Sequence, residues 1–205
     1  FRLNDDPIMY PSIDWRRYLL NKTSVQTQHN LNISGGTKDI RYFISLGFLY
    51  QNGLLKQFEG VGYDNNYKYK RYNYRANLDF DATKTTTLKI GIGGIVGNRN
   101  EPMINDATNS IWTLINQTTP FSSPGVIDGK LIVTPEERFD NKINLGNSAL
   151  PKCYGTGYST AINNTMNLDL LLNQKLDFIT KGLSAEIKGA YNTSYGFTKK
   201  RKGQV

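Results

Sequence analysis

The side chains best suited to catalysis or metal binding occur singly in this chain. His29 is the only histidine and Cys153 the only cysteine. A zinc site, or a thiol activated by histidine, needs several such groups close together. No second ligand stands near His29 in the sequence, and no acid–base pair can be placed. The sequence therefore predicts a protein that is not an enzyme and has no metal site, cofactor or internal disulfide.

A glycine-rich stretch, "GIGGIVGN" at residues 91–98, invites comparison with a nucleotide-binding loop. That motif, G-x-G-x-x-G, requires glycine where Val96 stands, and it leads into a helix. No helical pattern follows here. The glycines are better explained by a β-bulge, or by the close approach of another element to a strand.

Cations and tyrosines alternate in "YDNNYKYKRYNYR", residues 63–75, and the whole chain has a net charge of +8. Such a segment could stack on and neutralise single-stranded nucleic acid. The alternative, which we favour, is a belt of aromatic side chains where strands enter a membrane, because a tyrosine ring tolerates hydrocarbon while its hydroxyl reaches water. We expect no nucleic-acid partner. The predicted belt consists of Tyr67, Tyr69, Tyr72 and Tyr74.

The same region continues into a strict alternation of polar and apolar residues. In "RYNYRANLDFD", residues 71–81, the polar set contains Arg71, Arg75, Asp79 and Asp81. The apolar set contains Tyr72, Tyr74, Leu78 and Phe80. A period of two predicts a β-strand with one polar and one apolar face.

Six segments share this alternation, and they predict an all-β fold. Their lengths suit a tilted strand that crosses a bilayer, which needs about 9–11 residues, better than an average globular strand of about 5–6. Mean hydropathy is −0.50, and no run of 18 apolar residues is present. A membrane-spanning helix is therefore excluded, whereas a β-barrel is not. The predicted strands lie near 25–33, 40–50, 70–81, 86–97, 165–178 and 183–195.

The connections between these segments alternate strictly between short and long. Short turns at 34–39, 82–86 and 179–182 alternate with long loops at 51–69 and 98–164. Outer-membrane barrels sort their connections in this way, with short periplasmic turns and long extracellular loops. Six strands cannot close a barrel, which needs about eight. We therefore expect residues 1–205 to form part of a larger transmembrane antiparallel β-barrel whose plug domain lies outside this chain.

The charged side chains of the predicted strands share the polar face. Charges are costly in an apolar core but not in a wet lumen, where they can also grip a plug. The predicted lumen- or plug-facing residues are Arg41, Arg71, Arg75, Asp79, Asp81 and Lys89. In the longest loop, Trp112 and Phe121 are candidates for contact with a ligand or a lid. Ordinary loop packing is the alternative for both.

Several motifs in these segments resemble the early barrel of SusC/RagA-type TonB-linked outer-membrane proteins. The first is "QTQHNLNISGGTKDIRYFISLGFLYQNGLLK", residues 26–56, and the second is "YKRYNYRANLDFDATKTTTLKIGIGG", residues 69–94. Residues 118–125, "TTPFSSPG", resemble a segment of a long loop in that family, and residues 171–192 resemble the hairpin after it. The matched positions are Asn30, Ser34–Gly36, Arg41–Phe43, Ser45, Gly47, Phe48, Gln51 and Gly53, then Arg71–Arg75, Asn77 and Asp79.

The resemblance implies a function in the bacterial outer membrane. It implies a plugged barrel that imports oligosaccharides or peptides with energy from the TonB complex, beneath a SusD-like surface lipoprotein. No energy-coupling residue can be named on this chain. A soluble or surface all-β module that binds carbohydrate, or acts as an adhesin, is the alternative from another class.

Overall fold

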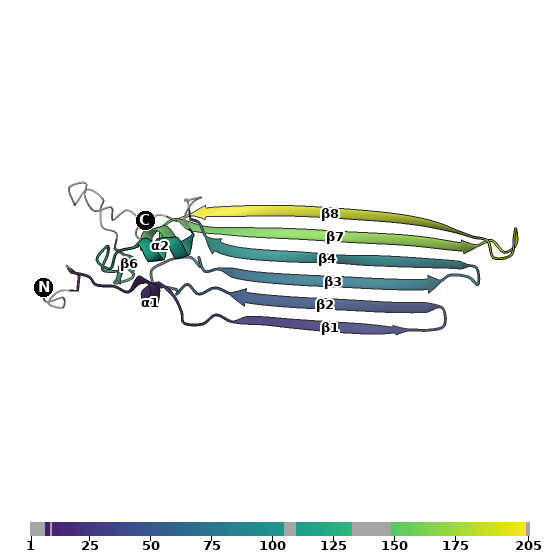
Figure 1. The fold of residues 1–205 in the computed structure, drawn as a ribbon, viewed down its shortest axis with the longest axis horizontal. Helices are drawn as coiled ribbons and strands as arrows, with labels where there is room; N and C mark the ends of the chain where they lie inside the picture. The colour runs from purple at the N-terminus through teal and green to yellow at the C-terminus, as the bar shows by residue number, and fades with distance from the viewer. Residues whose placement is uncertain (1–6, 9, 105–109, 133–148, 204–205) are drawn as a thin grey trace.

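A computed structural model describes residues 7–8, 10–104, 110–132 and 149–203, and its main feature is one long antiparallel sheet (Figure 1). The sheet has six strands in the order β1-β2-β3-β4-β7-β8, which is their order in the chain, and the separate β5-β6 hairpin lies in the connection from β4 to β7. The strands are β1 (Gln26–Gly36), β2 (Ile40–Asn52), β3 (Lys68–Asp81), β4 (Thr86–Pro102), β7 (Gly157–Lys175) and β8 (Ser184–Lys202). This confirms the predicted fold class, six antiparallel strands separated by short turns and long loops.

The strands run from 11 residues in β1 to 19 in β7 and β8, and their pairing is continuous. β4 pairs with β7 without interruption from Thr86 to Pro102, so the glycines of 91–98 do not form a bulge. They instead allow close approach. A Cβ on Gly94 would lie 2.5 Å from the Tyr74 hydroxyl oxygen and 2.5 Å from the Thr165 carbonyl oxygen.

The short turns all lie at one end of the sheet, and the long connections gather at the other (Figure 1). The turn between β7 and β8 is closed by Asp177, whose Oδ1 accepts a hydrogen bond from the Gly182 backbone N–H at 2.7 Å. Gly182 has φ of 84°, which favours glycine. The alternating connections therefore produce two different ends, as the sequence predicts.

At the other end, the segments outside the strands build a compact unit that we call the cap. Its described parts are residues 10–25, 53–67, 103–104, 110–132 and 149–156. It contains the helices α1 (Trp15–Leu19), α2 (Ile111–Gln117) and α3 (Ala149–Tyr154), and a small hairpin of β5 (Val126–Ile127) and β6 (Lys130–Leu131). None of the helices among the described residues is long and apolar enough to cross a membrane.

The cap, and not the sheet, holds the hydrophobic core. In α2, Ile111, Leu114 and Ile115 are buried at the spacing of one helix face, and Ser110 caps the helix by accepting a hydrogen bond from the Thr113 N–H. Chain segments far apart in the sequence meet in this core. Its buried members are Trp15, Leu19, Leu55, Ile111, Leu114, Ile115, Ala149, Leu150, Cys153 and Tyr154.

Candidate lumen face and cap pocket

The apolar face of the sheet is exposed from edge to edge. Register places side chains of the same parity in rows across the strands, for example Ile44, Ala76, Ile92, Leu168 and Tyr191. A water-soluble monomer rarely exposes a continuous apolar surface larger than a few hundred Å². The large apolar side chains exposed on this face are Leu31, Ile33, Ile40, Tyr42, Ile44, Leu46, Tyr72, Phe80, Ile92, Ile162, Leu170, Leu172, Ile187, Tyr191, Tyr195 and Phe197.

An aromatic row crosses this face towards the cap end of the strands. His29, Phe48 and Tyr72 occupy facing positions on β1, β2 and β3. The His29 and Phe48 ring centroids are 6.5 Å apart, and those of Phe48 and Tyr72 are 5.1 Å apart. Rings at this position suit the boundary between hydrocarbon and water.

The predicted aromatic belt is wrong for two of its four tyrosines. Tyr69 has the parity of Arg71, so it belongs to the polar face, where its hydroxyl would lie 3.2 Å from a Cβ on Gly97. Tyr67 precedes β3 and packs against the cap core, where burial raises the pKa of its phenol. Tyr72 and Tyr74 keep the apolar parity.

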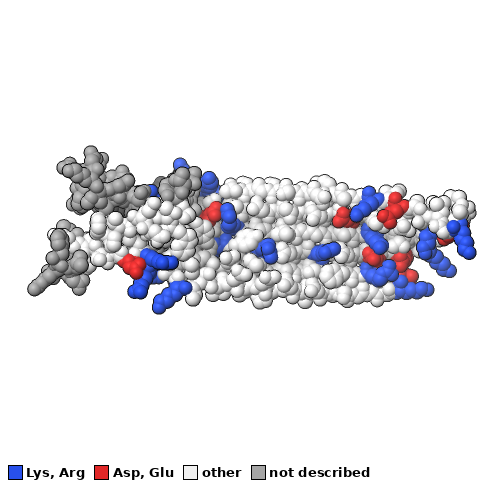
Figure 2. All heavy atoms as spheres, in the orientation of Figure 1, with Lys and Arg blue, Asp and Glu red and all other residues white. Residues whose placement is uncertain are grey.

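On the opposite face, charged side chains gather near the short turns (Figure 2). Arg41 Nη1 lies 3.3 Å from Asp81 Oδ2, and Arg41 Nε lies 3.9 Å from Asp79 Oδ2. Thr87 donates a 2.8 Å hydrogen bond to Asp81 Oδ1. Lys89 stands directly opposite Asp79 in the register of β3 and β4. Four of the six predicted lumen-facing residues are thus brought together.

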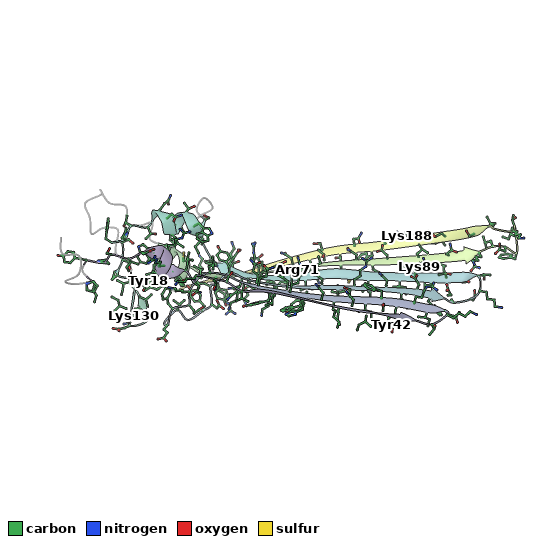
Figure 3. The ribbon with its side chains drawn as sticks, turned by 60° about the horizontal axis from the view of Figure 1, so that its bottom comes forward. Tyr18, Tyr42, Arg71, Lys89, Lys130 and Lys188 are labelled. Atoms are coloured by element: carbon green, nitrogen blue, oxygen red, sulfur yellow. The ribbon has the colours of Figure 1, made fainter. Side chains whose placement is uncertain are left out.

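The other two predicted residues of this face, Arg71 and Arg75, lie nearer the cap. Arg71 is close to the cap end of the sheet, whereas Lys89 and Lys188 lie near the short turns (Figure 3). Among the described residues, Arg71 Nε is buried and has no hydrogen-bond partner, and the same holds for Asn73 Oδ1. Both atoms are already covered by neighbouring atoms of this chain.

The polar face is also hollowed. One hollow of about 490 Å³ is lined by Arg41, Asp79, Lys89 and Lys188 among others, and a second of about 320 Å³ by Arg75 and Asn167 among others. Glycines contribute to these hollows: Gly91 lines both of them, and Gly93 lines the second. A face that is charged, hollowed and rich in amides suits water and a polar partner, and does not suit lipid.

Trp112 and Phe121, the predicted ligand or lid contacts, lie in different surroundings. Trp112, on α2, is 46% exposed and lines a cap cavity of about 700 Å³. Phe121 is 53% exposed and lies outside the lining of that cavity. The sequence did not predict the residues of α1 and of the segment after β2 that complete the cavity, because only the folded cap brings them together. We call this cavity the cap pocket.

Cys153 is part of the cap core, and it is predicted to be unreactive in the folded protein. Its side chain is fully buried, and burial raises the pKa of the thiol to about 12. At pH 8 about one thiol in ten thousand would be a thiolate, the form that reacts. We expect a maleimide to leave the native protein unlabelled and to label it fully in denaturant. Native labelling at the denatured rate would contradict the buried position.

Comparisons with known proteins agree with this architecture. No family model matches the sequence. The chain is similar to the TonB-dependent receptor SusC of Bacteroides thetaiotaomicron, with 28% identity over 125 residues, which is 54% of this chain and 12% of that protein. The chain therefore spans only a small part of that relative.

The solved structures that it resembles cover nearly all of the chain. The RagAB peptide importer in its closed-closed state has a TM-score of 0.61 and 16% identity over 93% of this chain and 20% of the matched chain. Another structure of the RagAB peptide transporter has a TM-score of 0.60 and 18% identity over 94% of this chain and 20% of the matched chain. The strand motifs, the sequence similarity to SusC and this shared fold together support a fragment of a SusC/RagA-type protein, and the fold corresponds to one part of such a β-barrel.

Proposed function

We propose that this chain forms part of the wall and extracellular loops of a TonB-dependent importer in the bacterial outer membrane. The observation that carries the proposal is the sheet itself, which has a continuous exposed apolar face opposite a charged and hollowed face. A soluble all-β module would have to cover that apolar face. In a barrel wall, lipid covers it.

The difference between the two ends of the sheet indicates which end faces the outside of the cell. Short turns belong to the periplasmic side of such barrels and long loops to the extracellular side, so the cap lies outside the cell. The charged face then lines the lumen. There Arg41, Arg71, Arg75, Asp79, Asp81 and Lys89 meet water, a plug domain or passing solute.

A plug on this face would meet charged side chains of the sheet. Among the described residues, Arg71 and Arg75 of β3 form no ion pair. Carboxylates and backbone carbonyl groups of a plug could accept hydrogen bonds from their guanidinium groups. The cargo of the whole protein is an oligomeric nutrient, a glycan or a peptide. A SusD-like lipoprotein over the cap completes the complex, and TonB supplies the energy.

Fractionation and uptake test this function. When the whole gene is expressed in its natural host, the protein should remain in the outer-membrane fraction after a carbonate wash and dissolve only in detergent. Deleting the gene should abolish growth on one class of oligomer while growth on its monomer continues. Recovery in the soluble fraction without detergent would refute the barrel and favour the soluble carbohydrate-binding alternative.

A further inference from the structure

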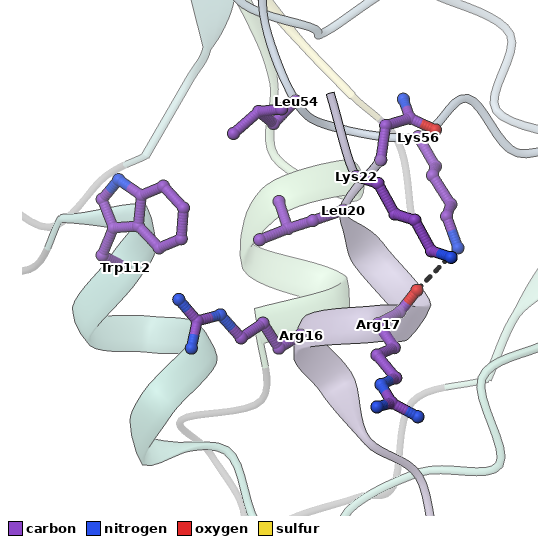
Figure 4. Close-up of a pocket in the computed structure, with 8 residues that line it drawn as sticks. Arg16, Arg17, Leu20, Lys22, Leu54, Lys56 and Trp112 are labelled. Carbon is purple, nitrogen blue, oxygen red and sulfur yellow. Dashed lines mark hydrogen bonds between the residues drawn. The ribbon is translucent and has the colours of Figure 1, made fainter. Parts of the chain in front are cut away.

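The cap pocket has an unusual set of lining side chains (Figure 4). Among the described residues that line it, four are cations, one is an indole, one is an amide and two are leucines, and none is a carboxylate. Clefts lined by charge of one sign concentrate ligands of the opposite sign. The lining residues are Arg16, Arg17, Leu20, Asn21, Lys22, Leu54, Lys56 and Trp112.

The floor of the pocket is anchored to the cap core. Asn21 N–H donates to the Leu54 carbonyl oxygen at 2.7 Å, and Lys56 N–H donates to the Leu19 carbonyl oxygen at 2.8 Å. Leu19 and Leu55, which belong to the same two segments, are buried in the core. The two segments that carry most of the cations are therefore held in register by backbone hydrogen bonds, so the pocket is formed before any ligand arrives.

Among the described residues, three of the four cations lack a counter-ion, and one of these three, Lys56, is held by a backbone carbonyl group instead. Arg17 pairs with Asp14 at 3.4 Å, and Lys56 Nζ donates to the Arg17 carbonyl oxygen at 2.6 Å, the dashed line in Figure 4. Among the described residues, Arg16 and Lys22 make no ion pair. They are free to bind an anion, and the planar guanidinium of Arg16 suits a carboxylate or sulfate with two oxygens.

Trp112 is held at the rim by its own helix. Ile111, Leu114 and Ile115 bury one face of α2 in the core, which leaves Trp112 on another face and 46% exposed. In Figure 4 the indole and the Arg16 guanidinium lie on the same side of the pocket, and Leu20 and Leu54 line it with them. A flat apolar ring next to charged donors can hold a ligand that is apolar on one face and acidic at its edge.

We propose that the cap pocket binds an acidic oligosaccharide, with Arg16 and Lys22 on its carboxylate or sulfate groups and Trp112 against a sugar ring. The lining side chains supply many donors and, apart from Asn21, no acceptor. A glycan offers hydroxyl and carboxylate acceptors. A peptide would bring backbone N–H donors and an ammonium group, and the described lining offers no acidic side chain for the ammonium group. The proposal rests on the proposed function and specifies its cargo.

The test is equilibrium binding by calorimetry to the intact protein in detergent. The probes are hexagalacturonate, its fully methyl-esterified and therefore neutral form, and hexaglutamate. We expect hexagalacturonate to bind at least tenfold more tightly than either of the others, and its affinity to fall as salt rises. Equal binding of the neutral ester, tighter binding of hexaglutamate, or no binding of any probe would overturn the proposal.

Variants locate the site. The double variant Arg16→Ala/Lys22→Ala should weaken hexagalacturonate binding at least tenfold. Lys130→Ala removes an exposed cation of the cap outside the pocket and should leave binding unchanged. Unchanged affinity of the double variant would refute the site. Membrane fractionation does not depend on these residues, so the two proposals can fail separately. If the protein is embedded in the membrane but fails the binding test, only the proposed pocket is refuted. If the protein is soluble, the proposed function is refuted.

Discussion

Replacing Leu168 with arginine should destabilise the folded protein in lipid by about 2–4 kcal/mol, the cost of a cation on the lipid face near the bilayer midplane. Leu168 lies near the middle of β7, between Ile92 on β4 and Tyr191 on β8 in one apolar row. An arginine there must place its charge in hydrocarbon or reach to the interface. The measurement is urea-induced unfolding of the whole protein in phospholipid vesicles.

Asn167→Arg is the matched control, one residue away on the opposite face. Asn167 stands between Gly93 and Asn192 and lines the smaller hollow of the polar face. The new side chain has room beside glycine and stays in water, so we expect a loss below about 1 kcal/mol. If the two variants lost the same stability, the faces would be wrongly assigned.

The second large effect concerns the cap. Leu114→Ala removes a fully buried side chain from the core and should destabilise the cap by about 2–5 kcal/mol. Because a factor of ten corresponds to about 1.4 kcal/mol, amide hydrogens of α2 and α3 should exchange roughly 30-fold faster or more. Hydrogen exchange read by mass spectrometry measures this, and the strands of the sheet should keep their protection.

Gln117→Ala provides the control for the cap. Gln117 lies in the same helix but is exposed, and alanine is a good helix former, so exchange should change little. Fast exchange in both variants would mean that the loss of protection is not specific to the buried leucine, and wild-type protection in both would mean that the core does not depend on Leu114.

The alternation of polar and apolar residues predicts the sheet because the two faces of each strand lie in different media. Where one face meets an apolar medium and the other meets water, every second residue is constrained, and "RYNYRANLDFD" shows this directly. Beyond the apolar band both faces meet water, and the constraint disappears. For this reason the alternation predicts strands that stop short of the cap. The predicted strands 86–97 and 165–178 miss the cap ends of β4, which continues to Pro102, and of β7, which begins at Gly157.

The cap was not predictable in the same way. Its helices have only 5, 7 and 6 residues, too short for a clear helical period in the sequence. Its core joins α1, the segment after β2, α2 and α3, and this contact depends on how the long loops fold over one end of the sheet. The cap pocket depends on the same contacts, so the sequence could suggest Trp112 but not Arg16 or Lys22.

Unlike the cap, the face on which Tyr69 lies can be predicted from the sequence. Tyr69 and Arg71 share a parity, so an unbroken strand must place them on one face. The predicted aromatic belt rests only on the nearness of the four tyrosines in the sequence. Applying the period of two to the whole of Lys68–Asp81 separates Tyr69 from Tyr72 and Tyr74.

The most direct test of the barrel wall asks what each face of β7 touches. Leu168→Cys and Asn167→Cys, each carrying a nitroxide spin label, can be compared in vesicles by power-saturation EPR. The native Cys153 is buried and should stay unlabelled. We expect the label at 168 to collide mainly with oxygen, which dissolves in lipid, and the label at 167 to collide mainly with a water-soluble nickel chelate. The reverse pattern, or nickel access at both positions, would contradict it.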